Sequence, residues 1–150
     1  MNKINSALQQ ARKNKQTVVL ATGVFDVLHL EHTIFLKNAK KIGDILLAGV
    51  ETDLRVRVLK GEGRPINNQK LRVSNLEKLK LADGVFILPK KFEKKEDYLK
   101  LLHDIKPDYL AVSSHTPYLE KKKKLMKKVG GELVVVHQHN PEFSTTKLVS

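Results

Sequence analysis

The sequence predicts an α/β fold, a doubly wound five-stranded parallel sheet with helices on both faces. Three observations favour this fold. Five short runs are apolar and often β-branched at consecutive positions, which is typical of strands that are buried on both faces. Each run is separated from the next by a segment long enough for a crossover helix. Several of these segments place apolar residues at intervals of three and four, as amphipathic helices do.

The elements follow in chain order. Strands are predicted over residues 17–20, 45–50, 85–88, 109–112 and 133–136. Between the first two strands, Ile34, Phe35, Ala39 and Ile42 form an apolar helical stripe, and Gly43 ends that helix. Further helices are predicted over residues 71–81, 98–105 and 118–129. Alternation of strands and helices throughout predicts a sheet that is covered on both faces.

The composition limits the size and type of the protein. A chain of 150 residues with 41% hydrophobic residues is expected to form one domain, residues 1–150, around a real core. It has no cysteine, which excludes a disulfide framework and a cysteine nucleophile. Residues 1–15 are polar and no apolar run approaches the roughly 20 residues that span a bilayer, so we expect a cytoplasmic protein without membrane insertion. The net charge of +12 suggests polyanionic ligands.

The first candidate site follows the first strand, where parallel sheets bind ligands beyond the strand ends. His29 and His32 stand at the expected amino terminus of a helix. Backbone N–H groups and the helix dipole attract a phosphate there, and imidazoles can donate hydrogen bonds to a phosphoryl group as its charge builds up. The alternative is that the two histidines form a half-buried polar pair or a first-turn cap.

Two further candidates lie elsewhere in the chain. Ser144, Thr145 and Thr146 open a helical start after the last strand, where they supply a cap and hydroxyl donors toward an anion. Residues 52–68 are predicted as a long loop, and long loops in compact α/β domains are typically functional. Cations of this loop and of the following helix can close over a polyphosphate and neutralise a leaving group, although solvated surface charges are a common alternative. These cations are Lys60, Arg64 and Arg72.

Taken in order, these motifs resemble the cytidylyltransferase-like nucleotidyltransferase family, which has a Rossmann-like fold. The segment from Gly23 to Asp26 fits the family pattern, and the two histidines and the Ser-Thr-Thr turn are shared with glycerol-3-phosphate cytidylyltransferases. The loop sequence Lys-Gly-Glu-Gly-Arg-Pro-Ile, which begins at Lys60, is most similar to the adenylyltransferase domain of the ADP-heptose synthesis enzymes. The resemblance extends over residues 17–149, nearly the whole chain.

The resemblance implies transfer of a nucleoside monophosphate from ATP or CTP to a small phosphorylated acceptor, a sugar phosphate or a polyol phosphate, with release of pyrophosphate. It implies that His29 and His32 stabilise the transition state and that Lys60 and Arg64 close over the reacting groups. Nucleotide-binding residues are implied at Gly23, Val24, Phe25, Asp26, Arg72, Ser144, Thr145 and Thr146. Ser113 and His115 are also predicted to bind the nucleotide, because they follow the fourth strand, near where a base or acceptor should lie. We further expect a Mg²⁺ ion that the nucleotide binds, no protein metal ligands, and a homodimer, which is common in the family.

Two departures from the family pattern keep a second hypothesis open. Glu31 stands where the family has glycine, and it adds a side chain and a negative charge beside an anionic ligand. After the fourth strand, residues 112–115 replace the lysine and aspartate that heptose-type relatives carry. The alternative hypothesis is a catalytically weak nucleotide-binding or regulatory protein on the same fold.

Two smaller sets of residues receive structural interpretations. The lysines at residues 121–124 and 127–128 lack interleaved aromatic residues and arginines, so we expect no specific nucleic-acid partner and a solvated helix face. His137 and His139 share one side of a strand end, and without a third neighbouring ligand we interpret them as a polar strand terminus.

Overall fold

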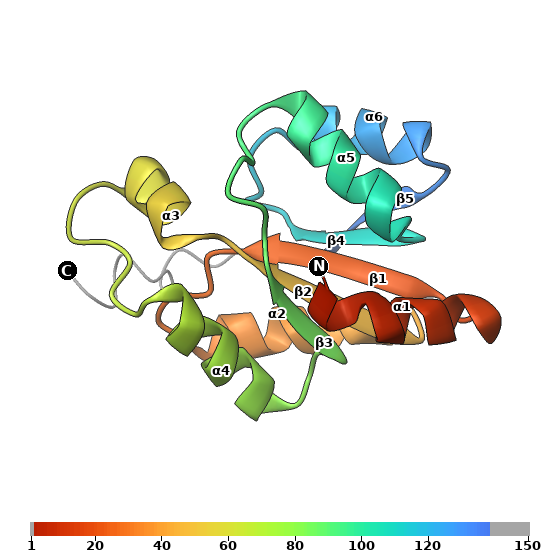
Figure 1. Ribbon diagram of the computed structural model, residues 1–150, viewed down its shortest axis with the longest axis horizontal. Coiled ribbons are helices and arrows are strands. Elements are labelled where there is room, and N and C mark those ends of the chain that lie inside the picture. Colours follow the sequence, from red (N-terminus) through yellow and green to blue (C-terminus); the bar gives the residue numbers. More distant parts are fainter. Residues whose placement is uncertain (1, 139–150) are drawn as a thin grey trace.

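The computed structural model describes residues 2–138 and confirms the predicted α/β class. Five parallel strands form one sheet in the order β3-β2-β1-β4-β5 (Figure 1). The strands are β1 (Val18–Gly23), β2 (Ile45–Val50), β3 (Gly84–Ile87), β4 (Tyr109–Ser113) and β5 (Glu132–His137). The helices are α1 (Asn2–Lys13), α2 (Leu30–Lys41), α3 (Asp53–Lys60), α4 (Gln69–Leu79), α5 (Lys95–Ile105) and α6 (Leu119–Lys128).

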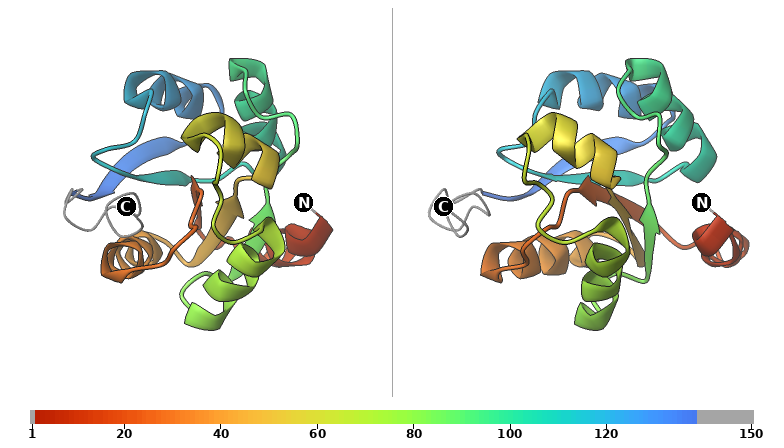
Figure 2. Two further views of the ribbon diagram at one scale, coloured as in Figure 1. Left: turned by 90° about the vertical axis from the view of Figure 1, so that its left-hand side faces the viewer. Right: turned by 60° about the vertical axis from the view of Figure 1, so that its left-hand side comes forward.

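The sheet is doubly wound because the strand order reverses at β1. The chain proceeds from β1 through β2 to β3 on one side and then returns to place β4 and β5 on the other side. Helices α1, α5 and α6 pack on one face, and α2 and α4 pack on the opposite face (Figure 2). The reversal places β1 between β2 and β4, which is where ligands bind in sheets of this kind.

Strand β1 shows why both faces of the sheet are apolar. Val18 and Leu20 pack with α1, α5 and α6, whereas Val19 and Ala21 pack with α2 and α4. Side chains alternate between the faces of a strand, so a sheet covered twice needs apolar residues at every position. Gly43, after α2, completes the packing because a Cβ atom there would lie 2.5 Å from a methyl carbon of Val19.

Two helices occur where the sequence analysis predicted none. Helix α1 lies in the polar segment 1–15, and its buried side chains Ile4, Leu8 and Ala11 follow helical spacing. The predicted loop 52–68 is wrong over Asp53–Lys60, which forms α3. The hydroxyl of Thr52 accepts a hydrogen bond from the N–H of Arg55 at 3.2 Å and begins that helix.

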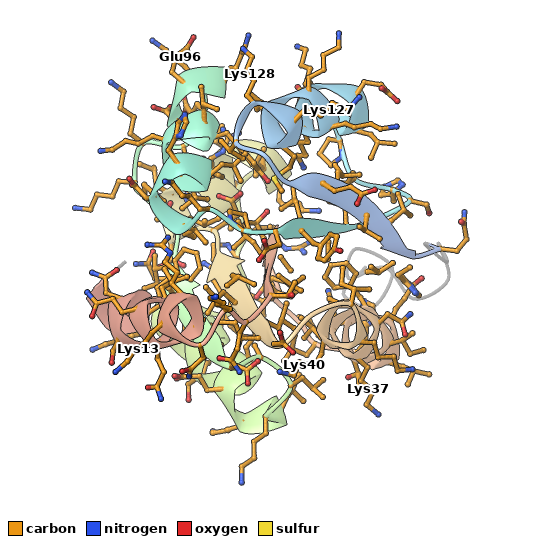
Figure 3. The ribbon with its side chains drawn as sticks, turned by 90° about the vertical axis from the view of Figure 1, so that its right-hand side faces the viewer. Lys13, Lys37, Lys40, Glu96, Lys127 and Lys128 are labelled. Atoms are coloured by element: carbon orange, nitrogen blue, oxygen red, sulfur yellow. The ribbon has the colours of Figure 1, made fainter. Side chains whose placement is uncertain are left out.

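The positive charge is distributed over the surface of the molecule. Lys127 and Lys128 extend from α6, Lys37 and Lys40 from α2, and Lys13 from α1, at separate places in the view of Figure 3. Lys40 also forms an ion pair of 2.6 Å with Asp83. No helix within residues 2–138 is long and apolar enough to cross a membrane.

Candidate active site

The strands separate at the carboxyl edge of the sheet. Strand β1 pairs with β2 as far as Gly23 opposite Val50, but its pairing with β4 covers Val19 with Tyr109 and Leu20 with Leu110. The last residues of β1 therefore lie beside β2 and not beside β4. The segment from Gly23 to His29 leads from this opening into α2.

The two histidines form a reciprocal cap at the start of α2. His29 is the N-cap residue, and its Nδ1 accepts a hydrogen bond from the N–H of Glu31 at 3.2 Å. The N–H of His29 donates to Nδ1 of His32 at 3.2 Å, and the two ring centroids are 4.0 Å apart. Because both Nδ1 atoms accept, each neutral ring carries its hydrogen on Nε2.

His32 is neutral near pH 7. Burial of the ring and, to a smaller extent, the neighbouring His29 together lower its pKa to about 4, although the carboxylate of Glu31 acts in the opposite direction. The ring of Phe25 lies 5.9 Å from that of His32 and contributes to its apolar surroundings. A neutral imidazole with hydrogen on Nε2 is a hydrogen-bond donor that carries no full charge.

Glu31 lies in the first turn of α2 and is buried. Its Oε1 is 2.8 Å from Nε2 of His137 at the end of β5. About two turns further along α2, the side-chain amide of Asn38 donates to the carbonyl of Val136 at 2.9 Å. Two contacts therefore join this helix to β5. The acidic side chain that departs from the family pattern is thus held against the last strand and near the positive end of the helix dipole.

Asp26 anchors the loop that follows α3. Its two carboxylate oxygens accept hydrogen bonds from the N–H groups of Ile66 at 2.6 Å and Asn67 at 2.8 Å. The side-chain amide of Asn67 donates in return to the Asp26 carbonyl at 3.0 Å. Arg64 lies 3.6 Å from the same carboxylate through its Nε. The loop is therefore held against the end of β1.

Arg72 is completely buried and bonded to the protein itself. Its guanidinium donates to the carbonyls of Asn67 at 2.9 Å, Val24 at 2.9 Å and Glu51 at 2.8 Å. It also donates to the carboxylate of Asp53 at 2.8 Å. Arg72 thereby joins the ends of β1 and β2 to the start of α3 and to the loop. This is a positioning role, and the predicted contact with a nucleotide phosphate stays a prediction.

The other candidate residues occupy varied places. Gly23 is required by close packing, because a Cβ atom there would lie 3.0 Å from the ring of Phe25. Lys60 is exposed at the end of α3, and His115 is exposed in the turn after β4. Ser113 ends β4, where its pairing with His137 follows an irregularity in the ladder. Ser144, Thr145 and Thr146 lie outside the described residues, so their predicted approach to the histidines stays a prediction.

The sequence analysis missed a polar cluster on the other face of the sheet. Its members are Glu51, Arg55, Tyr98 and Lys122, which come from the end of β2 and from α3, α5 and α6. The one signal available in the sequence was a glutamate directly after a buried strand. Among the described residues, no group of three or more histidine, aspartate and glutamate side chains is arranged to hold a metal ion.

Comparison with known proteins identifies the family of this chain. Residues 20–150 match the model of the family described as cytidylyltransferase-like. The chain belongs to the cytidylyltransferase-like family. Membership of this family indicates a nucleotidyltransferase. The matched residues include all of the candidate site residues that the structure describes.

Individual relatives of this cytidylyltransferase-like chain include the bifunctional protein HldE from several bacteria. The Campylobacter fetus protein is 39% identical over 103 residues, which is 69% of this chain and 21% of that protein. The protein of Yersinia pestis strain Pestoides F is 34% identical over 144 residues, 95% of this chain and 29% of that protein. The chain thus spans less than a third of the length of these relatives.

Solved structures share the fold. A lipopolysaccharide core biosynthesis protein from Thermoplasma volcanium is 28% identical, with a TM-score of 0.66 over 83% of this chain and 97% of that one. A pantoate-beta-alanine ligase from Francisella tularensis is 17% identical, with a TM-score of 0.65 over 91% of this chain and 66% of that one. The second likeness supports the fold alone.

Proposed function

We propose that the chain transfers a nucleoside monophosphate from ATP or CTP to the phosphate of a small phosphorylated acceptor, a sugar phosphate or a polyol phosphate. An oxygen of the acceptor phosphate attacks the α-phosphorus of the nucleotide. The bond from the α-phosphorus to the bridging oxygen breaks, and pyrophosphate leaves with that electron pair. The resemblance to the ADP-heptose synthesis enzymes favours a sugar phosphate as acceptor and ATP as donor.

The observation that carries the proposal is the paired cap of His29 and His32. Both rings have Nδ1 engaged by backbone N–H groups, so each presents Nε2–H as its donor at a helix amino terminus. In this reaction negative charge builds up on the phosphoryl oxygens, and fixed donors that meet it lower the barrier. No proton must be removed from a protein nucleophile, so catalysis consists of positioning and charge stabilisation.

The remaining candidates have supporting roles in this proposal. Lys60 at the end of α3 and Arg64 in the loop that Asp26 anchors close over the triphosphate in this proposal. We further propose that Ser144, Thr145 and Thr146 bind the β- and γ-phosphates, that Arg72 adds positive charge there while its guanidinium holds the loop, and that Ser113 and His115 contact the base. A Mg²⁺ ion would be bound mainly by the nucleotide phosphates, since magnesium commonly has few protein ligands in such sites, and it would neutralise charge on the leaving group. We propose that the active form is a homodimer. Light scattering of the purified chain measures its mass in solution and tests this.

Activity of point variants tests this function. Turnover is measured as pyrophosphate release with ATP or CTP and a panel of sugar and polyol phosphates. His29→Asn and His32→Gln each keep a side-chain acceptor for the cap hydrogen bond and remove the imidazole Nε2–H donor. We expect each to lower turnover at least about a hundredfold, the scale found when one such donor is lost. The control His103→Ala alters an exposed histidine of α5 and should retain full turnover.

A catalytically weak nucleotide-binding protein is the second candidate, favoured by Glu31 in the position of a glycine. Isothermal titration with ATP and CTP separates the two functions when it is combined with the pyrophosphate assay. Binding without turnover across the whole panel favours the second candidate. Turnover that depends on both a nucleotide and a phosphorylated acceptor excludes it.

A further inference from the structure

A second set of polar groups lies at the carboxyl edge, on the face of the sheet opposite the histidines. Leu20 of β1 and Leu47 of β2 belong to the core under α1, α5 and α6. Because side chains alternate along a strand, Thr22 and Glu51 continue this same face to the strand ends. The backbone of Glu51 is fixed there, since its N–H donates to the carbonyl of Gly23 at 2.9 Å.

Glu51, Arg55, Tyr98 and Lys122 together form what we call the β2-edge cluster. Arg55 and Lys122 are the charges that act most strongly on the Glu51 carboxylate. The ammonium of Lys122 donates to the hydroxyl of Thr116 at 2.9 Å and lies 5.9 Å from the centroid of the Tyr98 ring. Four separate parts of the chain therefore bring one acidic group, two basic groups and one phenol to one place, beside the hydroxyl of Thr116.

The β2-edge cluster contains polar atoms without hydrogen-bond partners in the described part of the chain. Oε2 of Glu51 and Nε of Arg55 are covered from solvent and make no hydrogen bond. The hydroxyl of Tyr98 lies beside Thr22, but the geometry there falls short of a hydrogen bond. Buried polar groups in native proteins are nearly always paired, so these groups can accept hydrogen-bond partners from water or from a bound ligand.

Three side chains of the cluster have pKa values shifted from their ordinary values. Burial raises the pKa of Glu51 and lowers the pKa of Lys122, and each charge partly offsets the effect on the other. Burial raises the pKa of Tyr98 to about 12, so its phenol keeps its proton. Glu51 and Lys122 are each half-buried, so part of both side chains faces the surface. Groups desolvated in this way bind a matching charge more strongly than solvated ones.

We propose that the β2-edge cluster is the acceptor subsite, in which Lys122 and Arg55 attract the phosphate of a small hydroxylated anion while Glu51 accepts hydrogen bonds from its hydroxyl groups. The inference rests on the proposed function, which requires a second substrate at the carboxyl edge beside the nucleotide. The histidines lie at the start of α2, which packs on the face of Val19 and Ala21, whereas the cluster lies on the face that α5 and α6 cover. Mixed donors and a carboxylate suit a sugar or polyol phosphate better than a simple inorganic anion.

Steady-state kinetics of Lys122→Met test the subsite. The variant keeps the length of the side chain and removes its charge. We expect the KM for the acceptor to rise at least about tenfold, the scale of one charge-assisted hydrogen bond, while the KM for the nucleotide changes less than about twofold. Tyr98→Phe should change the acceptor KM in the same direction. The control Lys123→Met removes an exposed lysine of the same helix and should behave as the parent chain.

A binding experiment on the full chain removes the dependence on turnover. Amide chemical shifts are followed during titration with inorganic phosphate and with glycerol 3-phosphate. Saturable shifts at Arg55, Thr116 and Lys122, weakened in Lys122→Met, support the subsite. Shifts confined to the first turn of α2, or spread over the exposed lysines, overturn it.

The two experiments separate the inference from the proposed function. Turnover with an unchanged acceptor KM in Lys122→Met means that the function stands and the subsite is wrong. Saturable shifts at the β2-edge cluster without turnover on any acceptor mean that the anion site exists and the proposed function fails.

Discussion

Arg72 gives the most direct test of how the site is built. In Arg72→Leu, the guanidinium that joins four acceptors disappears, and the carbonyls of Val24, Glu51 and Asn67 lose a donor. The carboxylate of Asp53 loses its 2.8 Å partner. Removing one member of a buried ion pair costs about 3–5 kcal/mol, and each buried acceptor left unpaired adds a further penalty unless water reaches it.

The expected loss of unfolding free energy is about 4 kcal/mol, because Asp53 is partly exposed and water can reach part of the gap. For a domain of this size that corresponds to a decrease in Tm of roughly 8–16 °C. Urea unfolding of the nucleotide-free chain measures the change. The control Arg57→Leu removes an exposed arginine of α3 and should alter the unfolding free energy by less than about 0.5 kcal/mol.

The nucleotide-free condition decides between two roles for Arg72. A side chain whose main task is to hold a phosphate leaves the stability of the free protein unchanged when it is removed. If Arg72→Leu retains the parental unfolding free energy within about 1 kcal/mol and loses nucleotide affinity, the structural role argued from its four hydrogen bonds is refuted.

Three further predictions follow from the polar groups of the site. The pKa of His32 lies near 4 in the folded chain and near 6.5 when unfolded, so the unfolded state binds the extra proton first. Stability should be fully present above about pH 6.5 and fall by about 3 kcal/mol as pH drops to about 4, a slope that His32→Gln should reduce in urea unfolding at several pH values. Asp26→Asn places an amide against two backbone donors, so hydrogen exchange at Ile66 and Asn67 should accelerate at least about tenfold, and unchanged protection would contradict the anchor. A double-mutant cycle of Glu31→Gln and His137→Ala should give a coupling energy of about 1 kcal/mol or more, and additive effects would show that the 2.8 Å pair contributes nothing.

The pattern of buried strands was the most predictable part of the fold. Apolar residues at consecutive positions require cover on both faces, which leads directly to a parallel sheet with crossover helices. The five strands occur as predicted, with ends that differ by no more than one residue except that β1 continues three residues further, to Gly23. Helix α1 was not predicted because its apolar residues Ile4, Leu8 and Ala11 are widely spaced within a polar segment. Their burial depends on the core that α5 and α6 complete from a distant part of the sequence.

The site was predictable where its chemistry is local in sequence. His29 and His32 are three residues apart, so their common position at the start of α2 follows from helix geometry. Partners that are far apart in sequence left no signal. Glu31 meets His137 across 106 positions, and Asp26 meets Asn67 across 41. The partner of the Glu31 carboxylate, His137, could therefore be identified only from the structure.

The buried polar side chains indicate which part of the fold is specialised for positioning polar groups. Within residues 4–138, four polar or charged side chains are buried: Asp26, Glu31, Thr52 and Arg72. All four lie at the carboxyl edge, and each is hydrogen-bonded to the backbone or to a side chain. Burying charged groups is costly unless they are paired, and a small domain could reach the same stability with apolar residues there. Their concentration at one edge is what a charge-stabilised reaction requires, because donors fixed before the substrate arrives need no reorganisation when charge develops.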